Sequence, residues 1–158
     1  VKFGHEKFVP IIETIEKPAK KNNIKNKTYN FKKKQNAEKK ILSDLKKNKI
    51  DLICLAGFMK ILSKSFIKRF GGKILNIHPS LLPKYKGLNT HERVIRNKEK
   101  YSGCTIHFVS SKLDSGKIIM QKKVKINKNE TIKSLKDKVL KQEHILYPKA
   151  IKKLFSNL

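Results

Sequence analysis

Two short apolar runs, each bordered by glycine, constrain the fold of this chain more than any other feature. Residues 52–56 read Leu-Ile-Cys-Leu-Ala and are followed by Gly57, while residues 73–77 follow the glycine pair 71–72. Short apolar runs without polar alternation are typical of parallel strands that are buried on both faces. Residues 65–70, between the two runs, are expected to form a short helix. The pattern therefore predicts an α/β fold.

The second half of the chain continues this pattern. Residues 105–109 and 117–126 are predicted strands, and the Asp114-Ser115-Gly116 turn between them allows an antiparallel pair. Residues 131–154 carry apolar side chains at helical spacing and predict one long helix, or a pair of helices with Pro148 at the kink. Strands alternating with helices and then a hairpin indicate a mixed sheet flanked by helices.

The first half is less apolar and richer in lysine. Residues 8–15 show helical spacing and precede Pro18, so a short amphipathic helix is expected there. Residues 24–31 are interpreted as a strand, and residues 36–48 as a helix that packs on a sheet. Residues 90–96 are predicted to form a further helix.

The chain has 158 residues and a formal net charge of +27, which suits one basic domain. Only three of its 39 basic residues are arginine. Selection for phosphate or base recognition would favour arginine, whose planar group binds two acceptors at once. A compositional bias toward lysine is therefore the preferred interpretation of the charge, with specific nucleic-acid binding as the alternative. Either way, weak and salt-dependent binding of polyanions is expected.

Several classes of protein are excluded by the sequence. No apolar run approaches the roughly 20 residues of a membrane-spanning helix, so no membrane partner is expected. Two cysteines are too few for a disulfide framework, and both Cys54 and Cys104 are expected in buried strands as reduced packing residues. Residues 1–10 alternate apolar and charged side chains, unlike a secretory signal. A cytoplasmic location is predicted.

Three polar residues suggest chemistry. Asn76 and His78 lie two apart in a predicted strand, so their side chains share one face near its carboxyl end, where open α/β sheets bind ligands. Together they offer an amide donor and a titratable ring, which suits a reaction that develops an oxyanion. Asp114 could stabilise a charged His78. The simpler alternatives are a structural loop histidine and an ordinary turn aspartate.

Five motifs in order resemble the folate-dependent formyltransferases, and among them the phosphoribosylglycinamide formyltransferases. The resemblance runs from about residue 24 to the C-terminus. The motifs are Leu55-Ala56-Gly57-Phe58-Met59-Lys60-Ile61-Leu62, the run from Asn76-Ile77-His78-Pro79 to Leu88-Asn89-Thr90-His91, Gly103-Cys104-Thr105-Ile106-His107-Phe108-Val109, Leu113-Asp114-Ser115-Gly116, and Gln142-Glu143-His144-Ile145-Leu146-Tyr147-Pro148.

The resemblance implies a one-carbon transfer in purine biosynthesis. The amine of glycinamide ribonucleotide would attack the formyl carbon of 10-formyltetrahydrofolate, and the tetrahedral intermediate would collapse to release tetrahydrofolate, without a metal. By the same resemblance, Asn76 would bond the formyl oxygen, His78 would donate a proton, and Asp114 would hold His78 and raise its pKa. His107 and Thr105 would contact these three residues rather than the substrates and would help to position them.

The resemblance also assigns binding residues. Glu143 would contact glycinamide ribonucleotide, although without the family it reads as an ordinary exposed helix residue. Residues 59–62 and 110–113 would line the folate pocket together with Asn76 and Asp114. Without the family, residues 59–62 would be interpreted as packing residues at the start of a helix. The folate-binding residues are Met59, Lys60, Ile61, Leu62, Asn76, Ser110, Ser111, Lys112, Leu113 and Asp114.

The N-terminus departs from the family pattern. The family opens with a strand and a Gly-Ser-Asn type loop that binds the substrate phosphate at a helix N-terminus. Here Gly4 is the only glycine before Gly57, and residues 1–22 match poorly. We therefore expect one formyltransferase domain over residues 1–158 that lacks the first βαβ portion, as a fragment would, and weaker phosphate binding.

Three alternatives remain open at this point. Methionyl-tRNA formyltransferase shares the Asn-x-His-Pro-Ser-Leu-Leu-Pro signature, and a positive surface would suit tRNA. Formyltetrahydrofolate deformylase is a second relative that uses the same cosubstrate. An inactive basic binding protein built on a formyltransferase remnant is the third. The sequence does not predict an oligomeric state.

Overall fold

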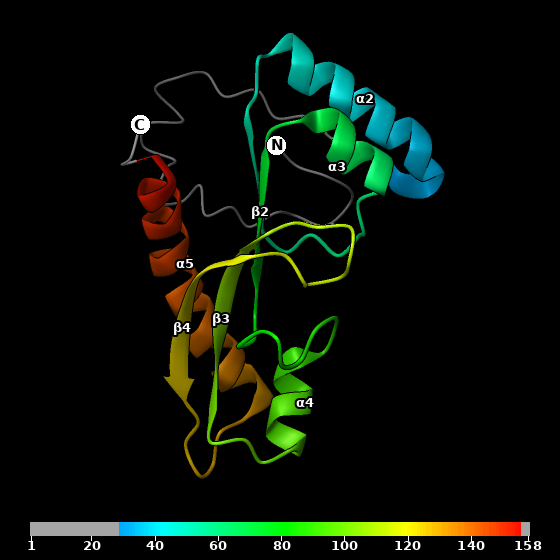
Figure 1. Ribbon diagram of the computed structural model, residues 1–158. Coiled ribbons are helices and arrows are strands. Elements are labelled where there is room, and N and C mark those ends of the chain that lie inside the picture. The colour runs from blue at the N-terminus through cyan, green and yellow to red at the C-terminus, as the bar shows by residue number, and fades with distance from the viewer. Residues whose placement is uncertain (1–28, 156–158) are drawn as a thin grey trace. The chain divides into compact units, whose positions relative to one another are not determined.

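The computed structural model describes residues 29–155 (Figure 1). The predicted helix at residues 8–15 and most of the predicted strand at residues 24–31 lie outside this range. The elements in chain order are η1 (Phe31–Lys33), α2 (Lys34–Lys47), β1 (Leu52–Leu55), α3 (Lys64–Phe70), β2 (Lys73–His78), α4 (Thr90–Arg96), β3 (Tyr101–Phe108), β4 (Ile118–Lys125) and α5 (Ile132–Phe155).

The strands are ordered β1-β2-β3-β4 in one four-stranded mixed sheet. The α/β class and the helices that flank the sheet confirm the coarse prediction. The chain divides into two compact units within β2, after Leu75. Within residues 29–155, no helix combines the length and the apolar character needed to cross a membrane.

In the first unit, helix α2 buries one face through residues spaced four apart. Ala37, Ile41 and Leu45 are all buried, and Glu38 beside them is also only 5% exposed. Four-residue spacing places these side chains on one stripe of the helix. The helix predicted at residues 36–48 is therefore confirmed, and it begins two residues earlier.

Helix α3 has a defined start and a defined end. The Ser63 hydroxyl accepts the backbone N–H of Phe66 at 3.0 Å, as an N-cap does. The Glu38 carboxylate accepts both the Ser63 N–H at 2.8 Å and its hydroxyl at 2.6 Å. At the other end Gly71 adopts a φ of 71°, the left-handed conformation that ends helices. One buried carboxylate thus fixes the cap of a neighbouring helix.

Two predictions for the first unit were wrong. Residues 29–31 are not a strand, because the Asn30 side chain accepts the Lys32 N–H at 2.9 Å and starts a helical turn instead. Strand β1 is not buried on both faces: Ile53 and Leu55 are buried, but Cys54 is exposed. Within the described residues β1 is the first strand of the sheet order, which is consistent with one covered face.

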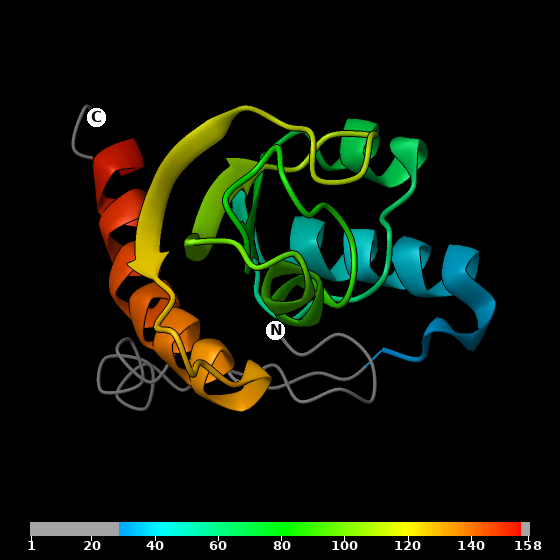
Figure 2. The same ribbon diagram turned by 90° about the horizontal axis from the view of Figure 1, so that it is seen from below.

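The second unit is built on a hairpin and a long helix. Strand β3 is buried along most of its length and pairs antiparallel with β4, with Thr105 opposite Gln121. Cys104 is fully buried there, as expected. The view from below shows helix α5 running along this hairpin (Figure 2).

Helix α5 is continuous through Pro148, so the prediction of one long helix holds rather than that of a helix pair. The Thr131 hydroxyl accepts the Ser134 N–H at 3.1 Å at its start. Leu135 and Val139 are fully buried four residues apart, as the helical spacing predicts.

Candidate active site

Strand β2 carries two of the predicted catalytic residues to one place. Asn76 and His78 lie two residues apart at its carboxyl end, so both side chains point to the same face. Pro79 follows and cannot continue the ladder of hydrogen bonds. His78 is only 5% exposed. The strand therefore presents an amide and an imidazole in a nearly dry environment.

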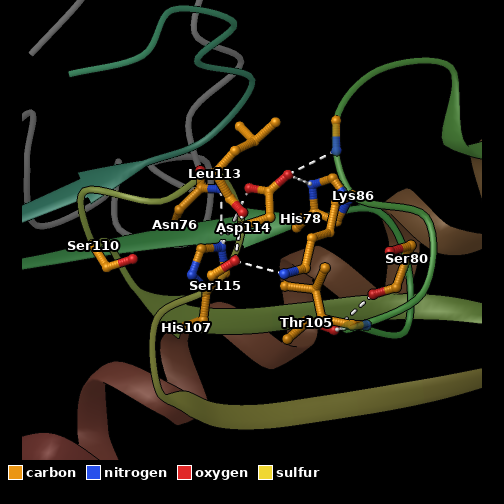
Figure 3. A network of polar contacts seen from close by, with 12 residues as sticks. Asn76, His78, Ser80, Lys86, Thr105, His107, Ser110, Leu113, Asp114 and Ser115 are labelled. Atoms are coloured by element: carbon orange, nitrogen blue, oxygen red, sulfur yellow. Dashed lines mark hydrogen bonds and ion pairs between the residues drawn. The ribbon is translucent and has the colours of Figure 1, made fainter. Parts of the chain in front are cut away.

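Asp114 reaches the same place from the loop between β3 and β4 (Figure 3). Its Oδ2 atom lies 3.4 Å from Nδ1 of His78 and accepts the backbone N–H of Gly87 at 2.9 Å. The residue has a φ of 42°, in the left-handed region that Asp tolerates better than most residues. Gly116 lets the loop close, because a Cβ atom there would lie 1.7 Å from the Phe108 carbonyl oxygen.

His78 is held at both ring nitrogens. Its Nε2 atom lies 2.8 Å from the Tyr85 carbonyl oxygen, and since a carbonyl only accepts, Nε2 carries the proton. Its Nδ1 atom faces the Asp114 carboxylate at 3.4 Å, which is long for a hydrogen bond. The ring is thus fixed by the tighter contact on one side and faces an anion on the other.

His107 sets the orientation of Asn76. The His107 Nδ1 atom donates to the Phe108 carbonyl at 2.8 Å, and Nε2 lies 3.3 Å from the Asn76 amide nitrogen. Burial lowers the pKa of His107, which favours the neutral ring with an acceptor at Nε2. The Asn76 amide then donates one N–H to His107 and keeps its second N–H for another acceptor. Asp114 also lies near, with Oδ1 3.7 Å from His107 Nε2.

Thr105 makes its hydrogen bonds to residues next to this cluster. Its hydroxyl donates to the Ser80 carbonyl at 2.6 Å and accepts the Leu82 N–H at 3.0 Å and the Gln121 amide at 2.8 Å. Thr105 therefore holds the loop that follows β2 rather than any of the three catalytic candidates. The sequence predicts a supporting role for Thr105 at the catalytic candidates, and its contacts are to the loop after β2.

The two loops that frame the site are joined by a second contact. The Lys86 ammonium donates to the Ser115 hydroxyl at 2.5 Å, and that hydroxyl donates to the Leu113 carbonyl at 2.7 Å (Figure 3). The Lys86 ammonium also adds positive charge near His107. Lys86 therefore places one positive charge at the edge of the site.

The predicted folate residues fall into two groups. Residues 59–62 lie in the first unit, in the irregular segment before α3, where Met59 and Ile61 are exposed, Lys60 is exposed and Leu62 is buried. Residues 110–113 lie in the second unit, in the loop that carries Asp114. In the second group Ser110 accepts the Lys112 N–H at 3.3 Å, Ser111 is exposed, and Leu113 is 50% exposed.

Glu143 lies on helix α5, away from the contacts just described. It is partly buried, and burial raises its pKa to about 7. Burial raises the pKa of the Cys104 thiol, and the charge of Glu143 raises it further. Alternation along β3 directs Cys104 away from the face that carries Thr105 and His107. No contact joins Glu143 to Asn76, His78 or Asp114, so its substrate role stays a prediction.

Three contributors to the site were not predicted as such. The Tyr85 carbonyl orients His78, the Gly87 N–H holds Asp114, and Gln121 fastens Thr105. Tyr85 and Gly87 do stand inside the second of the five motifs, and both have positive φ values, of 56° and 79°. Main-chain groups act here, which side-chain patterns do not reveal. Among residues 29–155, no group of His, Cys, Asp and Glu side chains is arranged to hold a metal ion.

The motifs imply an amide and an imidazole on one strand and a carboxylate on a nearby loop. A comparison with known families shows to which one the chain is related: the formyl transferase model matches residues 7–151. The chain belongs to the formyl transferase family. The formyl transferase match therefore includes both units and every candidate site residue.

Individual formyl transferases are similar over most of the chain. The phosphoribosylglycinamide formyltransferase of Haemophilus influenzae is 50% identical over 103 residues, which cover 65% of this chain and 49% of that protein. The trifunctional purine biosynthetic protein adenosine-3 of Chironomus tentans is 46% identical over 110 residues, or 70% of this chain and 8% of that protein. This chain thus spans about half of the first relative and a small part of the second.

The fold is similar to that of a solved formyl transferase. The crystal structure of phosphoribosylglycinamide formyltransferase from Streptococcus pneumoniae TIGR4 superposes with a TM-score of 0.82 and 31% identity, covering 97% of this chain and 84% of that chain. The two proteins are therefore similar in sequence as well as in backbone structure.

Proposed function

We propose that this chain transfers a formyl group from 10-formyltetrahydrofolate to the amine of glycinamide ribonucleotide, in de novo purine biosynthesis in the cytoplasm. The observation that carries the proposal is the cluster of Asn76, His78 and Asp114. His78 lies 3.4 Å from Asp114, and His107 lies 3.3 Å from Asn76 and 3.7 Å from Asp114. Relatives named phosphoribosylglycinamide formyltransferase support the choice of reaction.

Asn76 is suited to stabilise the charge that the reaction develops. When the amine nitrogen attacks the formyl carbon, the carbonyl oxygen becomes an oxyanion. An amide N–H that is already oriented stabilises such an oxygen without reorganising during the reaction. The second N–H of Asn76 is oriented by the bond of the first to His107. Asn76 therefore serves as the oxyanion donor.

His78 and Asp114 are suited to move the proton. The attacking amine must lose a proton, and the folate nitrogen must gain one when its bond to the formyl carbon breaks. Because Nε2 of His78 donates to the Tyr85 carbonyl at 2.8 Å, the looser Nδ1 is the atom that exchanges a proton. Asp114 stabilises the charged ring, directly or through a water, while the proton passes.

Binding of the two substrates follows the family assignment. Residues 59–62 and 110–113 would contact the folate, and the cationic Lys112 and Lys86 suit its anionic tail or the substrate phosphate. Glu143 would contact glycinamide ribonucleotide.

The acceptor specificity of the purified chain tests the proposal. Release of tetrahydrofolate is measured with glycinamide ribonucleotide, with methionyl-tRNA and with water as the only acceptor. We expect turnover that depends on glycinamide ribonucleotide and exceeds the other two rates at least tenfold. Faster reaction with methionyl-tRNA or water would instead assign one of the related activities. Folate binding with no turnover at saturating glycinamide ribonucleotide would leave only a binding protein.

A further inference from the structure

The loop between β2 and α4 carries two main-chain groups that hold the candidate catalytic pair. The Tyr85 carbonyl accepts the ring N–H of His78 at 2.8 Å, and the Gly87 N–H donates to Oδ2 of Asp114 at 2.9 Å. His78 and Asp114 face each other at 3.4 Å (Figure 3). The positions of both side chains therefore depend on the backbone of this loop.

The loop does not adopt its conformation by intrinsic preference. Tyr85, Gly87 and Asn89 have φ values of 56°, 79° and 54°, so every second residue is in the left-handed region. Glycine adopts this region freely and Asn tolerates it, but a bulky residue such as Tyr rarely does. Such a conformation persists where surrounding contacts stabilise it. Contacts from outside the loop must therefore fix its backbone.

Arg93 of helix α4 makes such contacts. Its Nη1 atom donates to the Lys86 carbonyl at 2.7 Å and to the Leu88 carbonyl at 3.3 Å. The guanidinium carbon also lies 5.3 Å from the centre of the Tyr85 ring, within the range of a cation–π interaction. Arg93 is one of only three arginines among the 39 basic residues of the chain. A lysine would be one bond shorter and would lack the planar group, so these contacts are specific to arginine.

The peptide group between Lys86 and Gly87 lies between a cation and an anion. Its carbonyl accepts from the Arg93 guanidinium, and its N–H donates to the Asp114 carboxylate. In a planar trans peptide the C=O and the N–H point in opposite directions, so a contact that fixes one also fixes the other. Hydrogen bonds in a chain polarise one another, so the bond to the cation also makes the N–H a stronger donor. The guanidinium thus orients a carboxylate that it does not touch.

We propose that Arg93 is a positioning residue, which holds Asp114 through the Lys86–Gly87 peptide. Through the same loop it also fixes the Tyr85 carbonyl that orients His78. Without the guanidinium the peptide can turn, its N–H leaves Oδ2, and the carboxylate is free to move away from the imidazole. The consequence for catalysis rests on the proposed formyl transfer, whereas the consequence for the Gly87 hydrogen bond does not.

Hydrogen exchange of backbone amides, followed by NMR on the whole 158-residue chain, tests the proposal without formyl transfer. In Arg93→Gln the Gly87 amide should exchange at least tenfold faster than in the wild type. The amide of Val139, which is fully buried in α5, should keep its rate. Arg96→Gln removes the same charge from the same helix and should change neither rate.

Two results of the exchange experiment would overturn the proposal. One is an unchanged rate at Gly87 in Arg93→Gln. The other is an equal acceleration at Gly87 and Val139, which would reflect a general loss of stability. Arg93→Lys keeps the charge and serves where Arg93→Gln fails to fold. It should accelerate exchange at Gly87 by a smaller factor of about three, and a wild-type rate there would also contradict the proposal.

The kinetics of formyl transfer measure the effect on catalysis. A displacement of about 1 Å in a catalytic group can cost 10²-fold in rate, so kcat should fall about 10- to 100-fold in Arg93→Gln. Arg93→Lys should recover part of this loss, and Arg96→Gln should match the wild type. Wild-type kcat in Arg93→Gln, with a faster Gly87 amide, would overturn the positioning role. An inactive wild type would instead count against the proposed function and leave the exchange result standing.

Discussion

The Oδ2 atom of Asp114 lies 3.4 Å from Nδ1 of His78, and these residues stand 36 positions apart in the chain. The contact exists because Asp114, in the left-handed conformation, lies in a loop that meets the end of a buried strand. The same Oδ2 atom accepts the Gly87 N–H, so the carboxylate cannot drift from the ring without losing a second bond. His78 is therefore paired with an anion whose position is set by the main chain.

Replacing Asp114 by Asn tests that pairing. The amide oxygen of Asn can still accept the Gly87 N–H, and Asn also tolerates the left-handed conformation. Only the charge beside His78 is lost. We expect kcat for formyl transfer to fall by about 10²- to 10⁴-fold, with a small change in the free energy of unfolding. The exposed Asp137→Asn is the matched control. Wild-type kcat in Asp114→Asn would show that the charge has no catalytic role.

The pKa of Glu143 predicts how stability changes with pH. Burial raises this pKa from 4.5 to about 7, so above pH 4.5 the folded state keeps a proton that the unfolded state has lost. The free energy of unfolding should therefore fall as pH rises through this range. Glu143→Gln removes the titration and should be more stable than the wild type at pH 8 by on the order of 1 to 3 kcal/mol, but not at pH 4.

Urea unfolding at the two pH values measures this difference. The exposed Glu92→Gln should show no comparable pH dependence relative to the wild type. If Glu143→Gln and the wild type differ equally at pH 4 and pH 8, then Glu143 has an ordinary pKa and is not buried as described.

The carboxylate of Glu38 is expected to stabilise the start of α3. It accepts the N–H and the hydroxyl of Ser63, and Glu38→Ala leaves both donors without that acceptor. We expect the free energy of unfolding to fall by about 1 to 3 kcal/mol. Lys39→Ala, at the next and exposed position, should change it by less than about 0.5 kcal/mol. Equal stability of the two variants would mean that the Glu38 bonds are replaced by water.

Two glycines offer a contrast between space and conformation. Gly116→Ala would place a Cβ atom 1.7 Å from the Phe108 carbonyl oxygen, so the loop that carries Asp114 must move and activity should be lost. Gly71→Ala meets no atom within 4 Å but strains a φ of 71°, so it should cost about 1 kcal/mol of stability and leave kcat unchanged. Full kcat in Gly116→Ala would show that the loop position does not matter to catalysis.

Much of the fold could be predicted because local patterns decide it. The bounds of α3, α4 and β2 follow from apolar periodicity and from the glycines and proline that end them. The strand predicted at residues 24–31 failed at residues 29–31, where one Asn side chain starts a helical turn. The exposure of Cys54 could not be foreseen, because an apolar run does not show which of its faces is covered.

The motifs predict the candidate residues Asn76, His78 and Asp114 but not how they come together, and their catalytic roles stay predictions. The spacing of Asn76 and His78 places them on one face from the sequence alone. The approach of Asp114 depends on a loop closed by Gly116 and on the Gly87 N–H, which are long-range main-chain contacts. The burial of Glu143 was likewise beyond the sequence pattern, because it depends on how α5 packs on β3.

The rate of formyl transfer to glycinamide ribonucleotide by the wild-type chain and by Asn76→Ala tests the central claim most directly. An oriented amide donor to the oxyanion is worth about 10²- to 10³-fold in kcat. We predict measurable turnover by the wild type, a loss of that size in Asn76→Ala, and full activity in the control Asn127→Ala. Equal kcat in the wild type and Asn76→Ala would contradict the account.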